Sequence, residues 1–181
     1  AVLVHVSSCG YPRCIRAAKG RDVQPGEVLI HATAVESGGQ CVLLMGASGS
    51  GKSDLALRLI GWPPMGLGLA PFCLVSDDQV LLASTADHTV ARVPETIAGQ
   101  IEVRGLGLIA IPYTSSAVVR LIVQLSPTDE IERMPEPKTL TLAGLALPAV
   151  KVNPFEHSAP LKVALALRTQ LLSQPVDREQ D

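Results

Sequence analysis

Gly46-Ala47-Ser48-Gly49-Ser50-Gly51-Lys52-Ser53 lies between two apolar segments of the chain. This run fits the pattern G-x-x-x-x-G-K-[ST] at all four specified positions, a pattern typical of P-loops that bind phosphate groups. The glycines let the backbone wrap closely around phosphates, and N–H groups at a helix N-terminus bind anions. Lys52 supplies a positive charge for the β- and γ-phosphates, and Ser53 supplies a hydroxyl for Mg²⁺. We therefore expect the chain to bind a nucleoside triphosphate.

The segments that flank this run are those that a phosphate-binding loop requires. Residues 41–45 before it are apolar and predict a buried strand. Residues 53–60 after it predict a helix, because the apolar side chains fall on one helical face: Leu55, Ala56, Leu59 and Ile60. A strand, a glycine-rich loop and a helix in this order favour a functional loop over a chance cluster of glycines.

Length and charge limit the classes of protein to consider. The 181 residues are enough for one domain with a substantial core. The net charge of −2 and the aromatic content of 3% argue against a nucleic-acid partner. No apolar run is long enough to span a membrane, and the first residues lack the pattern of a signal peptide. These observations predict a cytoplasmic protein without a membrane or nucleic-acid partner.

The cysteines favour the same setting. Cys41 and Cys73 lie in apolar runs, where a reduced, buried thiol is the commoner state. Cys9 and Cys14 have no matching second pair, so their spacing does not predict zinc binding.

Three regions are predicted along the chain. Residues 1–26 form a loosely structured lead-in, residues 27–173 form the P-loop domain, and residues 174–181 form a polar tail. Strands are expected to outnumber helices, which argues against an alternating doubly wound sheet. The predicted strands span residues 28–36, 40–45, 72–76, 80–84, 89–93, 108–112, 118–125 and 139–143, with hairpin turns at 38–39 and 86–87.

A helical turn is predicted at 94–98 and a closing helix at 158–172. Ser158 is its expected N-cap, and Pro160 suits its first turn. Its apolar face is expected to consist of leucines, namely Leu161, Leu165, Leu167, Leu171 and Leu172.

Four further residues are candidates for the chemistry of the site. Asp77 and Asp78 end an apolar strand, and adjacent strand residues face opposite sides, so one could orient while the other acts as a base. An acidic turn between strands is the alternative. Glu102 lies beside an arginine and two glycines, a weak signal that also fits an ordinary turn. His31 fits a structural role in a strand as well as a catalytic one.

Taken together, these segments resemble the catalytic domain of HPr kinase/phosphorylase, particularly the short form that lacks an extra N-terminal domain. The likeness spans roughly residues 29–167 and rests on the order of the motifs. A His-containing strand at 31–35 precedes the P-loop, and a strand at 74–80 contains the double aspartate. Residues 101–110 resemble the family signature Glu-[IV]-Arg-Gly-Leu-Gly, which generic P-loop proteins lack.

The resemblance implies a role for each matching residue. Lys52 would hold the nucleotide phosphates, and Ser53 and Glu102 would hold Mg²⁺. Asp78 would accept the proton of an HPr serine, supported by His31. Arg133 follows a glutamate, as the catalytic arginine of the family does, so the resemblance would give it that role. From the residues alone, Arg133 is a solvated charge on a loop.

The resemblance also implies a fold and an assembly. The fold would be α/β, a P-loop-containing mixed β-sheet with flanking helices, similar to the nucleotide-binding core of phosphoenolpyruvate carboxykinase. The protein would form a homohexamer and use ATP and Mg²⁺ to phosphorylate HPr. Residues 150–155 hold one cation where longer family members have two arginines, so dephosphorylation is less strongly implied than the kinase reaction.

Two other functions stay open. A small-molecule P-loop kinase would usually add an arginine-rich lid, and no arginine cluster is present. A nucleotide-binding regulatory module would need neither a base nor both metal ligands. A GTPase is disfavoured because the chain lacks an N-K-x-D motif.

Overall fold

The computed structural model describes residues 26–62 and 66–173. The lead-in and the tail expected from the sequence, together with Cys9 and Cys14, lie outside these residues. No helix in the described ranges is long and apolar enough to span a membrane.

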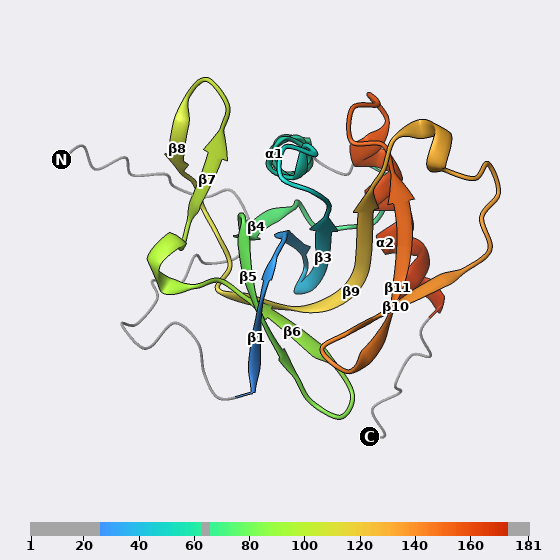
Figure 1. Cartoon of the computed structure of the whole chain (residues 1–181), viewed down its shortest axis with the longest axis horizontal. Coiled ribbons are helices and arrows are strands. Elements are labelled where there is room, and N and C mark those ends of the chain that lie inside the picture. Colours follow the sequence, from blue (N-terminus) through green and yellow to red (C-terminus); the bar gives the residue numbers. More distant parts are fainter. Residues whose placement is uncertain (1–25, 63–65, 174–181) are drawn as a thin grey trace.

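A curled, mixed sheet of nine strands forms the body of the protein (Figure 1). Seven strands follow one another in the order β1 (Glu27–His31), β5 (Gln79–Ser84), β6 (Thr89–Arg92), β9 (Ser116–Leu125), β3 (Gln40–Met45), β2 (Thr33–Ser37) and β4 (Cys73–Ser76). The remaining two are β11 (Leu145–Val152), which pairs with β9, and β10 (Lys138–Leu142), which pairs with β11. A separate hairpin consists of β7 (Gln100–Val103) and β8 (Gly107–Ala110).

The long strand β9 explains the curl of the sheet. One edge of β9 pairs in parallel with β3 along most of its length. On its other edge, β6 pairs antiparallel near the start of β9, and β11 pairs in parallel near its end. Because two strands share one edge of β9, the sheet divides there and bends.

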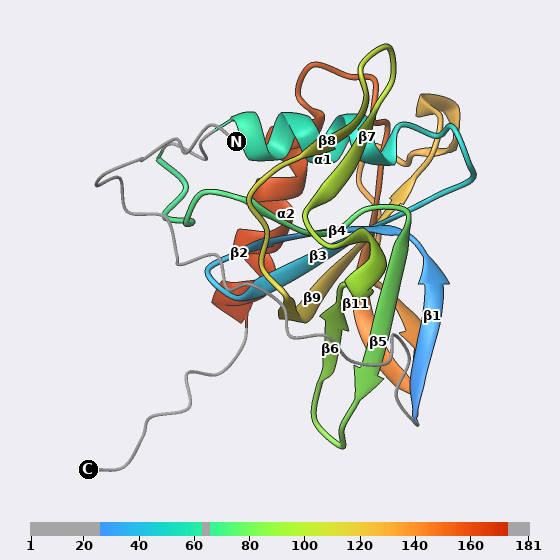
Figure 2. The same ribbon diagram turned by 90° about the vertical axis from the view of Figure 1, so that its left-hand side faces the viewer.

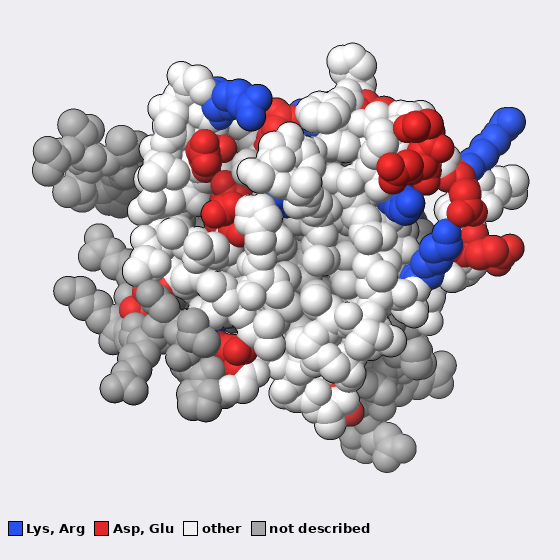
Figure 3. Space-filling model, viewed as in Figure 1, with Lys and Arg blue, Asp and Glu red and all other residues white. Residues whose placement is uncertain are grey.

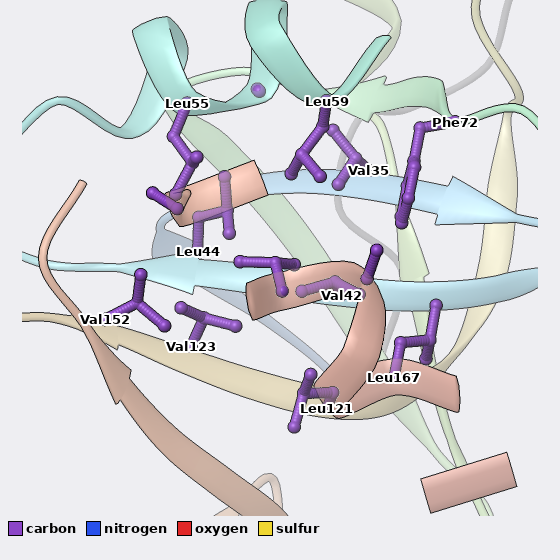
Figure 4. Close-up of a cluster of buried hydrophobic side chains, with 14 of the residues drawn as sticks. Val35, Val42, Leu44, Leu55, Leu59, Phe72, Leu121, Val123, Val152 and Leu167 are labelled. Atoms are coloured by element: carbon purple, nitrogen blue, oxygen red, sulfur yellow. The ribbon is translucent and has the colours of Figure 1, made fainter. Parts of the chain in front are cut away.

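Two α-helices cover the same face of the central strands, as Figure 2 shows. They are α1 (Lys52–Gly61) and α2 (Ala159–Ser173), and the described residues also form two short 3₁₀ turns, η1 (Glu95–Ile97) and η2 (Thr128–Glu130). Figure 4 shows Leu55 and Leu59 of α1 with Leu167 of α2 over Val42 and Leu44 of β3.

Strand β3 is buried on both of its faces, which accounts for its continuous apolar sequence. Val42 and Leu44 point to the cluster beneath the helices. The alternate residues Cys41 and Leu43 belong to a second cluster on the opposite face. Such two-sided burial is typical of strands with parallel neighbours. The glycine-rich segment therefore follows a strand that is buried on both faces.

Most predicted elements are confirmed. The hairpin turn at Gly38 and Gly39 has the positive φ angles that glycine tolerates, 59° and 81°. The strands around residues 72–76, 80–84, 89–93, 108–112, 118–125 and 139–143, the turn at 94–98 and both helices are present within a few residues of their expected bounds.

One predicted strand, at 28–36, is wrong as a single element. The structure divides it at Ala32 into β1 and β2. The division arises because β1 pairs with β5 whereas β2 pairs with β3 and β4. Strands β7 and β11 were not predicted. Within β11, Pro148 obscured the pattern, and the strand pairs with β9 only from Ala149 onward.

Only two of the five leucines predicted for the apolar face of α2 contact the core. Leu167 is buried and Leu171 packs against the core. Leu161, Leu165 and Leu172 are exposed instead. The helix buries its smaller residues in their place, since Ala159, Pro160, Val163 and Ala164 face the sheet. The prediction relied on the positions of the leucines, but the buried face of α2 consists mainly of these smaller residues.

The cysteine expectation can be checked for two residues. Neither Cys41 nor Cys73 is in a disulfide, and Cys41 is buried as expected, whereas Cys73 is only half-buried. Burial, together with the negative charge of Glu36, raises the pKa of the Cys41 thiol far above its ordinary value. Cys41 is therefore a structural residue of β3 rather than a nucleophile.

Leu44 offers a direct test of the cluster beneath the helices. Leu44→Ala should lower the free energy of unfolding by about 2–5 kcal/mol, because it removes a fully buried side chain. The same change at Leu106, which is 74% exposed, should alter it by less than about 0.5 kcal/mol. Urea unfolding of both variants measures the difference, and equal effects would contradict this packing.

Candidate functional site

A cavity of about 500 Å³ opens where β3 ends and α1 begins. Its size is typical of small-molecule sites. It is lined by parts of β1, the glycine-rich loop (residues 46–51), α1, the β4–β5 turn, β7, and the loop between β11 and α2. The lining side chains and backbone come from His31, Ser48, Gly49, Gly51, Lys52, Ser53, Asp54, Leu57, Asp78, Glu102, Val103, Arg104 and Phe155.

Charged side chains gather in two places on the face shown in Figure 3. One is beside the β7–β8 hairpin, where carboxylates lie below a positively charged side chain, and the other is on the loop before β10. The first group borders the cavity, because Glu102 and Arg104 of this hairpin line it.

The glycine-rich loop turns the chain sharply from β3 into α1. Gly49 and Gly51 have φ angles of 76° and 90°, a left-handed conformation that strains other residues. Gly51 is the N-cap of α1 and makes no side-chain capping bond. The first N–H groups of a helix lack intrahelical partners, and the helix dipole is positive at this end. The loop and the start of α1 therefore form an anion-binding surface within the cavity.

Lys52 lies at the centre of this surface and is 6% exposed. Its Nζ donates hydrogen bonds of 3.0 Å to the carbonyl oxygens of Gly46 and Ala47. A third bond, also 3.0 Å, runs to Nε2 of His31. The ammonium group is thus held inside the loop by three acceptors, within reach of an anion that enters the cavity.

His31 connects Lys52 to Asp78. Because Lys52 can only donate, Nε2 of His31 is the acceptor and Nδ1 carries the proton. Nδ1 then donates to the backbone oxygen of Asp78 at 2.9 Å and lies 3.0 Å from its carboxylate. The three side chains form one chain of hydrogen bonds across the cavity.

The two adjacent aspartates have opposite environments. Asp77 is 5% exposed, whereas the side chain of Asp78 is 66% exposed. Asp78 has a φ of 67°, uncommon for a residue other than glycine. Such strained conformations cluster at functional sites. The turn therefore directs the Asp78 carboxylate into the cavity and the Asp77 carboxylate into the protein.

The carboxylate of Asp77 accepts three hydrogen bonds from three different elements. Thr33 of β2 and Ser53 of α1 donate to Oδ1 at 2.7 and 2.8 Å. The backbone N–H of Glu102 in β7 donates to Oδ2 at 3.0 Å. Asp77 thereby fixes Ser53 and strand β7 relative to each other.

The donor set of the site suits Mg²⁺. The described residues contain no group of three or more His, Cys, Asp or Glu that could hold a metal by themselves. Mg²⁺ is usually held by one or two protein oxygens together with waters and substrate phosphates. The Ser53 hydroxyl and the Glu102 carboxylate meet this need, because both line the cavity and Asp77 contacts both residues.

The structure brings together most of the residues singled out in the sequence. His31, Lys52, Ser53, Asp78 and Glu102 all line the cavity. Gly46, Ala47 and Ser50 shape the loop without lining the cavity. Arg133 lies on the exposed loop between η2 and β10 and is not among the lining residues.

Several contributors were missed in the sequence. The structural role of Thr33 had no signal, because it depends on a contact with Asp77 that is 44 residues away. Arg104 was visible only as a neighbour of Glu102. Phe155, in the loop between β11 and α2, had no signal at all.

Comparison with known proteins identifies the family. Residues 25–159 match the family described as the HPr Serine kinase C-terminal domain. The chain therefore belongs to this family.

Curated relatives include the proteins named HPr kinase/phosphorylase of Burkholderia lata and Burkholderia cenocepacia. Each is 37% identical over 135 residues, which is 68% of this chain and 39% of the relative. The chain thus spans well under half the length of these relatives.

A solved structure also resembles this one. The HPr(Ser) kinase/phosphatase from Coxiella burnetii aligns with a TM-score of 0.66 and 22% identity, over 80% of this chain and 91% of that chain. At this level of identity the likeness bears on the fold, and it supports the mixed α/β architecture.

The buried environment of Asp77 and the solvated environment of Asp78 can be compared by making the same substitution at both residues. Asp77→Asn should lower the free energy of unfolding by about 1–3 kcal/mol, because an amide cannot accept all three hydrogen bonds. Asp78→Asn should change it by less than about 0.5 kcal/mol, because that side chain is largely solvated. Thermal or urea unfolding of the two variants measures this, and a larger loss at Asp78 would contradict the assignment.

Proposed function

We propose that the chain is an ATP- and Mg²⁺-dependent protein-serine kinase that phosphorylates the phosphocarrier protein HPr. The observation that carries this proposal is the hydrogen-bonded chain from Lys52 through His31 to Asp78 at the N-terminus of α1. Membership of the HPr kinase family supports HPr as the protein substrate.

Binding of the nucleotide would use the glycine-rich loop as a P-loop. The backbone N–H groups at the start of α1 would hold the phosphates. Lys52 would exchange its bonds to the carbonyls of Gly46 and Ala47 for bonds to phosphate oxygens. Because the new acceptors are negatively charged, this exchange favours binding.

Ser53 and Glu102 would hold Mg²⁺, with Asp77 fixing both residues through its hydrogen bonds. The ion would neutralise charge on the phosphates as the bond to the leaving group breaks. Asp77 itself would act as a positioning residue, since it is buried and already accepts three hydrogen bonds.

Asp78 would act as the base. As the serine oxygen bonds to the γ-phosphorus, the bond from that phosphorus to ADP breaks, and the serine proton passes to the Asp78 carboxylate. The Nδ1–H of His31, 3.0 Å from this carboxylate, would hold it in place. A serine hydroxyl is a weak nucleophile, so a positioned base of this kind is needed.

The role of Arg133 as a catalytic arginine rests on the resemblance alone, because its loop does not line the cavity. The reverse reaction, dephosphorylation of HPr, has less support than the forward one. Lys151, the cation of residues 150–155, does not line the cavity either, and its Nζ donates to the Glu130 backbone oxygen at 3.4 Å.

A cytoplasmic homohexamer is part of the proposal. The exposed leucines of α2, Leu161, Leu165 and Leu172, would suit a subunit interface, since exposed apolar side chains favour association.

The kinase proposal is tested by incubating the protein with ATP, Mg²⁺ and HPr, and measuring phosphoserine by mass spectrometry. Asp78→Asn should reduce the rate by about 10²-fold or more, because it removes the base without changing the shape of the side chain. The matched control is Asp87→Asn, the same change on an exposed turn between β5 and β6, which should leave the rate unchanged.

Each alternative has its own outcome in this assay. Nucleotide binding without transfer to HPr by the unaltered protein would favour a regulatory module. Phosphorylation of a small molecule but not of HPr would favour a small-molecule kinase. Incubation of phosphoserine-HPr with inorganic phosphate measures the reverse reaction, which we expect to be slower than the forward one.

A further inference from the structure

Phe155 is an exposed aromatic residue in a chain that has few. The sequence contains two phenylalanines. Phe72 is 3% exposed and lies in the core beneath the helices, whereas Phe155 is 72% exposed. Its exposed face is therefore available to contact another aromatic group.

The ring of Phe155 lies against the glycine-rich loop. A methyl group added at Gly51 would come within 3.3 Å of this ring and 3.4 Å of Pro154. Phe155 also lines the same cavity as Lys52 and Asp78. The ring therefore sits beside the residue at which the loop becomes α1, while most of its surface faces solvent.

The backbone around Phe155 is held in place from two sides. The side chain of Asn153 accepts a hydrogen bond of 3.0 Å from the Phe155 N–H. Arg58 of α1 donates to the backbone oxygens of Pro154 and, at 3.3 Å, of Glu156. Arg58 is itself paired with Asp54 at 3.0 Å. These contacts fix the loop against α1 and so present the exposed ring in a defined position.

The loop that carries Phe155 and the β7–β8 hairpin lie on different sides of α1 (Figure 1). In Figure 1, β7 with Glu102 lies on one side of α1, and the loop between β11 and α2 lies on the other. A nucleotide whose terminal phosphate points toward Asp78 can extend across the loop, with its nucleoside on the side of Phe155. Phe155 lines the cavity on that side.

We propose that Phe155 is the platform on which the adenine base of the nucleotide stacks. This inference rests on the nucleotide binding proposed above and adds the residue that recognises the base. Every nucleobase has a π face, and stacking on an aromatic side chain strengthens binding substantially. Because Arg58 and Asn153 already hold the backbone on both sides of the ring, this loop loses little freedom when a base stacks there.

The test compares a ligand that has a base with one that has none. Calorimetric titrations with ATP and with inorganic tripolyphosphate, each with Mg²⁺, are made on the full chain and on Phe155→Ala. We expect Phe155→Ala to bind ATP about tenfold more weakly and tripolyphosphate equally well. Phe155→Tyr, which keeps an aromatic face, should bind ATP within about twofold of the unaltered protein. Met134→Ala, on the exposed loop before β10 and outside the cavity lining, is the control for loss of an exposed apolar residue.

The other outcomes overturn the proposal in distinguishable ways. Equal weakening of ATP and tripolyphosphate would show that the ring only supports the loop at Gly51. An unchanged affinity for ATP in Phe155→Ala would show that the base does not contact the ring. If the unaltered protein bound neither ligand, nucleotide binding itself would fail and this inference with it. Binding of tripolyphosphate but not of ATP would leave the phosphate site intact and refute the base platform alone.

Discussion

The buried carboxylate of Asp77 holds the site together. A carboxylate removed from water is costly unless its oxygens receive hydrogen bonds, and Asp77 receives three. Its donors come from β2, α1 and β7, three elements that are far apart in the sequence. The requirement to satisfy one buried charge thus fixes Ser53 and Glu102, the two residues suited to a metal ion, relative to each other.

Asp78 shows how the same residue type, one position later, obtains a different role. Its positive φ turns the carboxylate into the cavity, where it stays largely solvated. There it receives the Nδ1–H of His31, whose other nitrogen accepts from Lys52. One aspartate therefore positions the site, and the other is available to take a proton. Stability and chemistry are divided between adjacent residues, so the first aspartate matters for folding and the second for the reaction.

The sequence was informative wherever a local pattern decides the structure. The glycine-rich loop, the buried strand before it and the apolar face of α1 follow from short-range spacing, and the structure confirms them. The break at Ala32 could not be foreseen, because it depends on which strands pair with β1 and β2. The same limit applies to the site: Lys52 and Asp78 belong to recognisable motifs, whereas Phe155 reaches the cavity only through the path of a distant loop.

The central claim is that Lys52 and Asp78 face the terminal phosphate of a nucleotide in this cavity. A crystal structure with Mg²⁺ and a non-hydrolysable ATP analogue tests it most directly. The account predicts that Nζ of Lys52 leaves the carbonyl oxygens of Gly46 and Ala47 for a phosphate oxygen, with the Asp78 carboxylate directed at the same phosphate. A nucleotide bound elsewhere, or one that leaves Lys52 on those carbonyls with Asp78 turned away, would contradict it.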